Sequence, residues 1–193
     1  MLHAEISGFL ESERRRREAR PAGPLGALVS KVDLACDGPA ARTGERVLAA
    51  LTTAAADPAL LAAGQCLARV EGYARHILYG DPAGRFTVLA LVWGPNQFSP
   101  PHAHHAWCAY AVRSGTLTET LYTFDSTAEA ARPLRVAARP SGYACFAEAG
   151  LDQIHRLGNA GAEPAMSIHV YGVAHERIAT GVNRMVEVAP ATD

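Results

Sequence analysis

The 193-residue sequence has no long hydrophobic segment and no closely spaced cysteines. No apolar run approaches the roughly 18 residues that a membrane-spanning helix needs. The first twenty residues carry their arginines after a short apolar stretch, which is the reverse of a secretory signal. The four cysteines form no Cys-x-x-Cys pair and are widely spaced: Cys36, Cys66, Cys108 and Cys145. We therefore expect a cytoplasmic protein with reduced thiols and without a structural zinc knuckle.

The sequence also has no excess of charge of either sign. Its 18 Lys and Arg residues balance 19 Asp and Glu residues, and the formal net charge is -1. No global positive field favours nucleic acid or anionic lipid, so we expect neither as a partner. The one basic run, Arg14–Arg17, is flanked by Glu11, Glu13 and Glu18, and we interpret it as a solvated helix face.

What is present is an ordinary globular composition, with 49% hydrophobic residues. The length predicts a single domain over residues 1–193, as a monomer or a small homo-oligomer. Residues 1–70 are rich in Ala and Leu at helical spacing, as in Arg46–Leu51. Asp57 followed by Pro58 predicts the start of a further helix that continues through Leu67 to Val70.

Residues 71–193 have a β pattern. Strand-like segments rich in β-branched and aromatic residues occur at 85–93, 117–124 and 166–171, separated by turn signals such as Gly94-Pro95-Asn96 and Pro140-Ser141-Gly142. Several short strands at this spacing indicate antiparallel sheets closed around an interior. The predicted fold is therefore mainly β, a barrel with an N-terminal helical extension.

Three of the eight histidines lie in the run His102-Ala103-His104-His105. On a strand, residues i and i+2 point to the same side, so His102 and His104 can both face a barrel interior while His105 faces away. A metal site needs a third ligand from a distant segment, and His155 is the best candidate because it lies in a strand-like segment after a glycine turn. A lone HxH is a weak signal, since interior histidines are often hydrogen-bonded core residues.

The spacing around these histidines resembles the two motifs of the cupin superfamily, whose fold is a jelly-roll β-barrel. The first motif continues to Gly115, and the second ends in His155 and Asn159. Cys108 stands where a typical cupin has a glutamate ligand. Three neutral imidazoles would leave a divalent charge uncancelled and an open face for a chelating anion and O2. Imidazole ligands alone do not select between iron, copper, nickel and zinc.

Taken together, several separated motifs resemble the cysteine dioxygenase family of thiol dioxygenases. They extend over about half of the chain: Tyr73–Arg75, Phe86–Gly94, His102–His104, Cys108, Gly115–Tyr122, His155–Asn159 and Ser167–Tyr171. The resemblance implies Fe(II) bound by His102, His104 and His155. It also implies that a small thiol is oxidised with both atoms of O2 to a sulfinic acid.

The resemblance assigns the substrate carboxylate to Arg75, whose guanidinium offers a planar fork to a carboxylate, with the Tyr73 hydroxyl beside it. Members of the family that prefer 3-mercaptopropionate commonly have glutamine at this position, so Arg75 favours L-cysteine. Trp107 instead resembles the bacterial mercaptopropionate enzymes. The substrate is therefore expected to be L-cysteine, with 3-mercaptopropionate or another small thiol carboxylate as the alternative.

Ser167, His169 and Tyr171 alternate along one strand and share a face. They resemble the family's relay, in which Ser167 orients His169 and His169 places the phenol of Tyr171. Cys108 matches the residue that forms a thioether to this tyrosine in animal-type members. A role as a small apolar residue that only fills space in the core is an equally good interpretation. A non-catalytic metal-binding cupin would keep the histidines but would not need Arg75 or the relay.

Overall fold

The computed structural model describes residues 20–189, so Arg14–Arg17 and the rest of the first 19 residues lie outside the described part. Residues 20–70 contain two α-helices, α2 (Gly23–Cys36) and α3 (Thr43–Ala56), and three short 3-10 helices, of which η2 (Pro58–Leu60) and η3 (Ala63–Cys66) follow α3. A 3-10 turn, η1 (Ala40–Arg42), joins α2 to α3, and another, η4 (His175–Arg177), follows the last long strand.

Helices α2 and α3 bury one apolar face each. In α2 this face includes Leu28 and Val32, and in α3 it includes Val47, Leu51 and other residues at helical spacing, all of them almost inaccessible to solvent. Helix α2 has a proline in its first turn, where no N–H is needed, and α3 has an acidic residue there. The expected helical character of this region is therefore present over residues 23–56.

The further helix predicted from Pro58 to Val70 is wrong. Asp57 does accept a hydrogen bond from the backbone N–H of Ala59 at 2.8 Å, but the helix that it caps ends at Leu60. Leu67 and Val70 are 66% and 98% exposed, so no apolar face is buried that would stabilise a longer helix.

Ten strands follow. Their bounds are β1 (Ala74–Gly80), β2 (Thr87–Trp93), β3 (His102–His104), β4 (Cys108–Ser114), β5 (Thr116–Asp125), β6 (Ala130–Pro140), β7 (Ala144–Ala147), β8 (Gly150–Gly158), β9 (Ala165–Tyr171) and β10 (Asn183–Met185). Strands β2, β5 and β9 match the predicted segments to within two residues. Strand β6 was not anticipated, because it contains two prolines and three arginines. It lies at the end of its sheet, where prolines cost no interstrand hydrogen bond.

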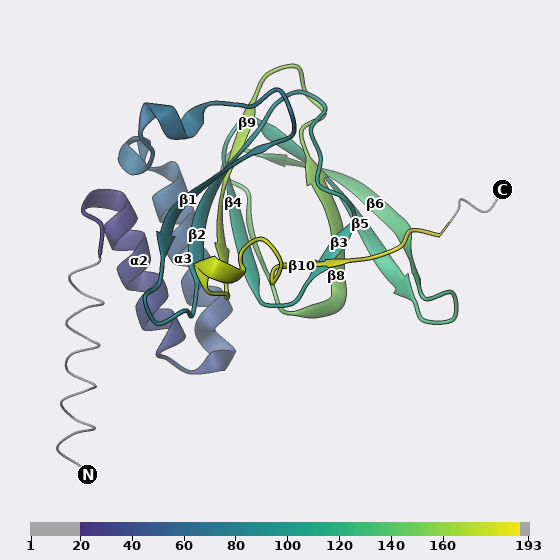
Figure 1. Ribbon diagram of the computed structural model, residues 1–193, viewed down its shortest axis with the longest axis horizontal. Coiled ribbons are helices and arrows are strands. Elements are labelled where there is room, and N and C mark those ends of the chain that lie inside the picture. Colours follow the sequence, from purple (N-terminus) through teal and green to yellow (C-terminus); the bar gives the residue numbers. More distant parts are fainter. Residues whose placement is uncertain (1–19, 190–193) are drawn as a thin grey trace, which may run out of the picture.

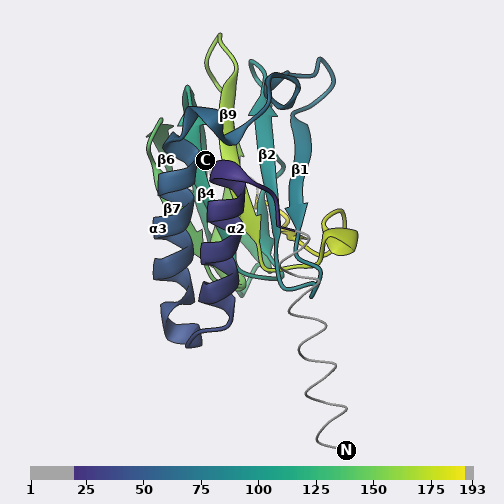
Figure 2. The ribbon, with the colours of Figure 1, turned by 90° about the vertical axis from the view of Figure 1, so that its left-hand side faces the viewer.

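The strands form two five-stranded antiparallel sheets that face each other (Figure 1). One sheet has the order β1-β2-β9-β4-β7, and the other has the order β10-β3-β8-β5-β6. Helices α2 and α3 cover the outer face of the first sheet, with α3 packed on β4, β7 and β9 (Figure 2). The predicted fold class, a mainly β barrel with N-terminal helices, is confirmed.

The first sheet separates two apolar clusters. Its outer face packs against the helices through side chains such as Val88, Ile168 and Val170. Its inner face contributes Leu89, Leu91 and other residues to a second cluster between the sheets. This alternation along β2 and β9 explains why β2 is buried at every position.

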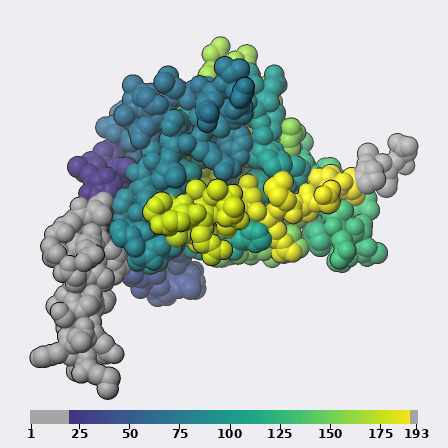
Figure 3. All heavy atoms as spheres, in the orientation of Figure 1, coloured from purple at the N-terminus to yellow at the C-terminus, as the bar shows by residue number. Residues whose placement is uncertain are grey.

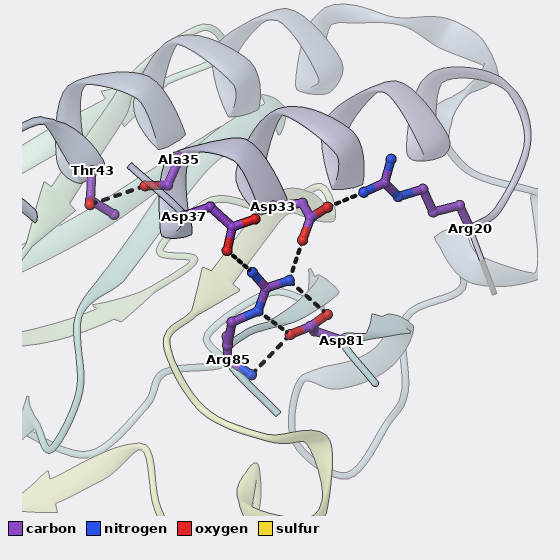
Figure 4. A network of polar contacts seen from close by, with 7 residues as sticks. All are labelled: Arg20, Asp33, Ala35, Asp37, Thr43, Asp81 and Arg85. Carbon is purple, nitrogen blue, oxygen red and sulfur yellow. Dashed lines mark hydrogen bonds and ion pairs between the residues drawn. The ribbon is translucent and has the colours of Figure 1, made fainter. Parts of the chain in front are cut away.

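A network of charged side chains attaches α2 to the loop between β1 and β2 (Figure 4). The guanidinium of Arg85 pairs with Asp81 in its own loop at 2.7 Å, and with Asp33 and Asp37 on α2. Arg20 pairs with Asp33 from the other side. Burial alone would raise the pKa of Asp81, but hydrogen bonds from Arg85 outweigh it and hold that pKa below its usual 3.8.

The C-terminal segment, including η4 and β10, crosses one face of the barrel (Figure 3). Strand β10 pairs with β3 and so forms the edge strand on that side of the second sheet. None of the helices in residues 20–189 combines the length and the hydrophobicity needed to cross a membrane.

Candidate metal and substrate site

The second sheet brings three histidines together. His102 and His104 lie on β3 and His155 lies on β8, and one ring nitrogen of each falls within 4.8 Å of the others. All three side chains are buried. A trio of converging imidazole nitrogens is an arrangement that can hold a transition-metal ion.

Strand register explains this convergence. His155 is the direct antiparallel partner of His102, and the register shifts between His102 and His104. Ala103 packs on the opposite side of the sheet with Ile154, and His105 is exposed. The alternation expected from the HxH spacing is therefore present, and the pairing of β3 with β8 places the third imidazole beside the other two.

Outer hydrogen bonds orient two of the three rings. The Nδ1–H of His102 donates to the carbonyl oxygen of Pro100 at 2.8 Å, and the Nδ1–H of His155 donates to Oε1 of Glu119 at 2.6 Å. Each ring therefore keeps its Nε2 lone pair available. The Nδ1 of His104 is buried and has no hydrogen-bond partner within the described residues.

The protonation state of the rings also suits a metal. Burial lowers the pKa of His102 to about 4 and the pKa of His104 to about 2, and the neighbouring His155 adds to both shifts. Both rings are therefore neutral at physiological pH, which is the form that binds a metal. A donor set of three imidazoles fits an ion such as iron, and the ligand type does not by itself select the metal.

Glu119 is the residue that the sequence analysis missed. It lies on β5, is 3% exposed, and bridges His155 to the Nε–H of Arg139 at 2.7 Å. Burial would raise its pKa, but hydrogen bonds from His155 and Arg139 outweigh this and lower it, so Glu119 is a carboxylate. A signal was present in the sequence, because Glu119 occupies the same alternating face as Leu117 and Leu121.

The first sheet presents a cationic group to the same space. The guanidinium of Arg75 donates to the hydroxyl of Tyr73 at 2.7 Å. Tyr73 precedes the first residue of β1 and stacks on Trp93, with 4.3 Å between ring centroids. Arg75 is thereby held beside the cavity by a phenol rather than by a carboxylate, which leaves its positive charge available to an anion.

A chain of hydrogen bonds runs along β9. The indole N–H of Trp93 donates to the Oγ of Ser167 at 2.9 Å, and the Ser167 hydroxyl contacts Nε2 of His169 at 2.8 Å. Nδ1 of His169 lies 3.0 Å from the hydroxyl of Tyr171. Burial lowers the pKa of His169 to about 3, so its ring is neutral and carries one proton.

The direction of this chain follows from its first member. Trp93 can only donate, so Ser167 accepts the indole N–H and has its own hydroxyl proton free for a hydrogen bond to Nε2 of His169. His169 then carries its own proton on Nδ1 and donates it to the oxygen of Tyr171. The phenolic proton of Tyr171 is consequently not used by His169 and is available to the cavity.

Cys108 lies beside this tyrosine. It is the direct antiparallel partner of Tyr171 across β4 and β9, so the two side chains lie on the same face of the first sheet. Burial raises the pKa of the Cys108 thiol, with the neighbouring Cys145 adding to the shift. Cys108 is therefore a neutral thiol and not an anionic replacement for the glutamate of a typical cupin.

These groups line one cavity between the sheets, which has about 330 Å³ of empty space, its mouth included. Its polar or ionisable wall consists of Tyr73, Arg75, Ser99, His102, His104, Cys108, His155, His169, Tyr171 and Asn183. Ser167 lies behind this wall. Trp107 stacks on Phe146 under the helices and does not line the cavity, so it gives no direct contact with a substrate. Arg177 is exposed on η4 and does not line the cavity.

Residues 48–180, well over half of the chain, match the family model described as cysteine dioxygenase type I. The chain belongs to the cysteine dioxygenase type I family. Membership indicates a cupin-type dioxygenase that acts on a small molecule with O2, and the three-histidine cluster is consistent with a metal such as iron.

Solved structures with low sequence identity align with part of this chain. The protein TT1209 from Thermus thermophilus is 20% identical, with 57% of this chain and 91% of that one covered and a TM-score of 0.45. A double-stranded β-helix protein from Klebsiella pneumoniae is 16% identical, with coverages of 62% and 88% and a TM-score of 0.46. The polyketide cyclase RemF from Streptomyces resistomycificus is 17% identical, with coverages of 64% and 75% and a TM-score of 0.44. These likenesses say nothing about activity. The fold of this family member is a cupin barrel with N-terminal helices.

Proposed function

We propose that this protein is an Fe(II)-dependent dioxygenase that oxidises L-cysteine with O2 to cysteine sulfinic acid. One observation carries the proposal: three converging imidazoles on one sheet and a cationic clamp with a phenol on the facing sheet line the same small cavity. A non-catalytic metal-binding protein has no need of the second half of this site.

Fe(II) would be held by the Nε2 atoms of His102, His104 and His155. A bound ferrous ion supplies the electron chemistry that allows triplet O2 to react with a spin-paired thiolate, and its charge favours the thiolate form of the substrate. Because no carboxylate joins the three histidines as a fourth ligand, the centre would keep positive charge that an anionic thiolate can neutralise.

Arg75 sets the class of thiol. Its guanidinium would bind the substrate carboxylate through a pair of charge-assisted hydrogen bonds, and the Tyr73 hydroxyl, already in contact with Arg75, would hold the guanidinium in place. The clamp and the histidines come from facing sheets and line the same cavity, which supports a ligand with a thiol at one end and a carboxylate at the other. This arrangement disfavours thiols without an anionic end and supports cysteine over larger thiols.

Tyr171 would act at the reacting end. Ser167 and His169 hold its oxygen, and with Nδ1 of His169 as the donor the phenolic proton would be free to serve a group inside the cavity. From this position Tyr171 can hydrogen-bond to the bound substrate or to oxygen during the reaction. The apolar side chains around the relay exclude bulk water and strengthen these hydrogen bonds.

The test is a panel of thiols with the iron-loaded protein. L-cysteine, 3-mercaptopropionate and cysteamine are compared by kcat/KM from O2 uptake, with sulfinate identified by mass spectrometry. The proposal predicts the highest kcat/KM for L-cysteine and little turnover of cysteamine, which has no carboxylate. A higher kcat/KM for 3-mercaptopropionate would reassign the substrate. No product from any thiol at full iron occupancy would favour the non-catalytic reading.

A further inference from the structure

A buried ion pair lies directly behind one of the three histidines. Glu119 accepts the Nδ1–H of His155 on one carboxylate oxygen at 2.6 Å, and the Nε–H of Arg139 on the other at 2.7 Å. The side chains of Glu119 and Arg139 are 4% and 13% exposed. The guanidinium of Arg139 also lies 4.2 Å from the ring centroid of Tyr143. These contacts fix both partners in one arrangement.

The other two histidines have no such partner. His102 donates to a neutral backbone carbonyl, and the Nδ1 of His104 has no partner among residues 20–189. An anionic acceptor polarises an imidazole N–H more strongly than a carbonyl does, and so increases the electron density on the opposite nitrogen. His155 is therefore the strongest donor of the three.

We propose that Glu119 and Arg139 form a positioning pair that sets the metal-donor strength of His155, with Glu119 increasing it and Arg139 moderating it. This inference rests on the proposed metal site. The sheet order makes the pair possible, because β6, β5, β8 and β3 are consecutive neighbours. The positive charge of Arg139 on β6 can therefore influence His155 on β8 through the carboxylate of Glu119 on β5.

The two members can be substituted separately. Glu119→Gln keeps the shape of the side chain and removes its charge. Arg139 borders a surface cavity with about 690 Å³ of empty space, so Arg139→Gln does not empty the apolar core. The ion pair between Arg132 and Asp125 joins the same two strands at 3.0 Å, but its side chains are more exposed and do not contact a histidine. Asp125→Asn is therefore the matched control.

The experiment measures Co(II) and anaerobic Fe(II) affinity by competition with a chelator, together with the visible absorption bands of bound Co(II). Loss of an outer partner of a metal-binding histidine typically costs about 10–100-fold in affinity, and we expect this loss in Glu119→Gln. Arg139→Gln should bind at least as tightly as the wild type, with Co(II) bands shifted in the opposite direction to those of Glu119→Gln. Asp125→Asn should be unchanged.

The outcomes separate this inference from the proposed function. If the wild type binds metal and both variants lose affinity together, the pair has only a structural role and the inference is wrong; unchanged affinity in both variants contradicts it as well. If the variants shift in opposite directions but no thiol is oxidised, the inference stands and the proposed activity does not. A wild type that binds no metal overturns both.

Discussion

Cys108 lies directly opposite Tyr171 across strands β4 and β9, and both side chains line the cavity. This register is independent of any ligand, because it is set by the antiparallel pairing of the two strands. It brings a thiol and a phenol together at the wall of the cavity that also contains the three histidines.

A thioether between these residues is therefore expected after aerobic turnover. Its formation removes the thiol hydrogen and one ring hydrogen, and O2 accepts the two electrons and two protons as hydrogen peroxide in an iron-dependent reaction. Intact-mass analysis before and after incubation with iron and cysteine should show the loss of two hydrogen atoms in part or all of the protein. Cys108→Ala should show none, and an unchanged mass in the wild type would rule the crosslink out.

Replacing Arg75 should separate carboxylate binding from chemistry. Arg75→Gln removes a charged hydrogen-bonding group, whose loss costs about 1.5–3 kcal/mol and raises KM for L-cysteine by about 10–100-fold. The low activity with cysteamine should change little, because this thiol lacks the carboxylate. Arg177→Gln, at an exposed arginine outside the cavity, serves as the control. Equal effects on both thiols would contradict the assigned role.

The relay should affect turnover more than substrate binding. Ser167→Ala removes the proton donor to Nε2 of His169, so the ring can adopt the other tautomer and no longer donate to Tyr171. We expect kcat to fall by roughly 10-fold or more, with a small change in KM. The same experiment with Ser141→Ala, an exposed serine in the turn after β6, should leave both constants unchanged. An increase in KM alone would place Ser167 in substrate binding instead.

The network around Arg85 makes stability depend on pH. The lowered pKa of Asp81 means that its carboxylate stabilises the fold well above pH 3.8, and that this contribution disappears as the pH falls through the folded-state pKa. Asp81→Asn should reduce the free energy of unfolding by about 1.5–3 kcal/mol at neutral pH. The difference from the wild type should shrink in acid.

Urea denaturation at several pH values measures this difference. Asp37→Asn is the matched control, because Asp37 contacts the same guanidinium but its side chain is 55% exposed. Its effect should stay below about 1 kcal/mol. A deficit in Asp81→Asn that persists unchanged at acid pH would contradict the electrostatic explanation.

Much of the fold and of the candidate site follows from local patterns. Alternation places His102 and His104 on one face and turns His105 outward, and the glycine turns mark the ends of strands such as β8. Each of these features depends on a few residues that are neighbours in the sequence, so a local pattern can predict it. The resemblance to the cysteine dioxygenase family added Arg75 and Tyr171 to the predicted site, and their roles remain proposals.

Other features depend on distant partners, and the local pattern gives at most their strand face and not their role. Glu119 looks like one polar residue in a strand, and its importance comes from facing His155, which is 36 residues away. Trp93 reads as the end of a buried strand, and only the packed structure shows that it connects Tyr73 to Ser167. The helix predicted after Asp57 failed because a capping residue cannot stabilise a helix whose apolar face has nothing to pack against.

The most direct test of the central claim is the reaction of the iron-loaded protein with L-cysteine under ¹⁸O₂, with the iron content measured in the same sample. The account predicts cysteine sulfinic acid with both oxygen atoms labelled, and loss of iron binding in His102→Ala and His155→Ala. Unoxidised cysteine at full iron occupancy, or a product with a single labelled oxygen, would contradict it.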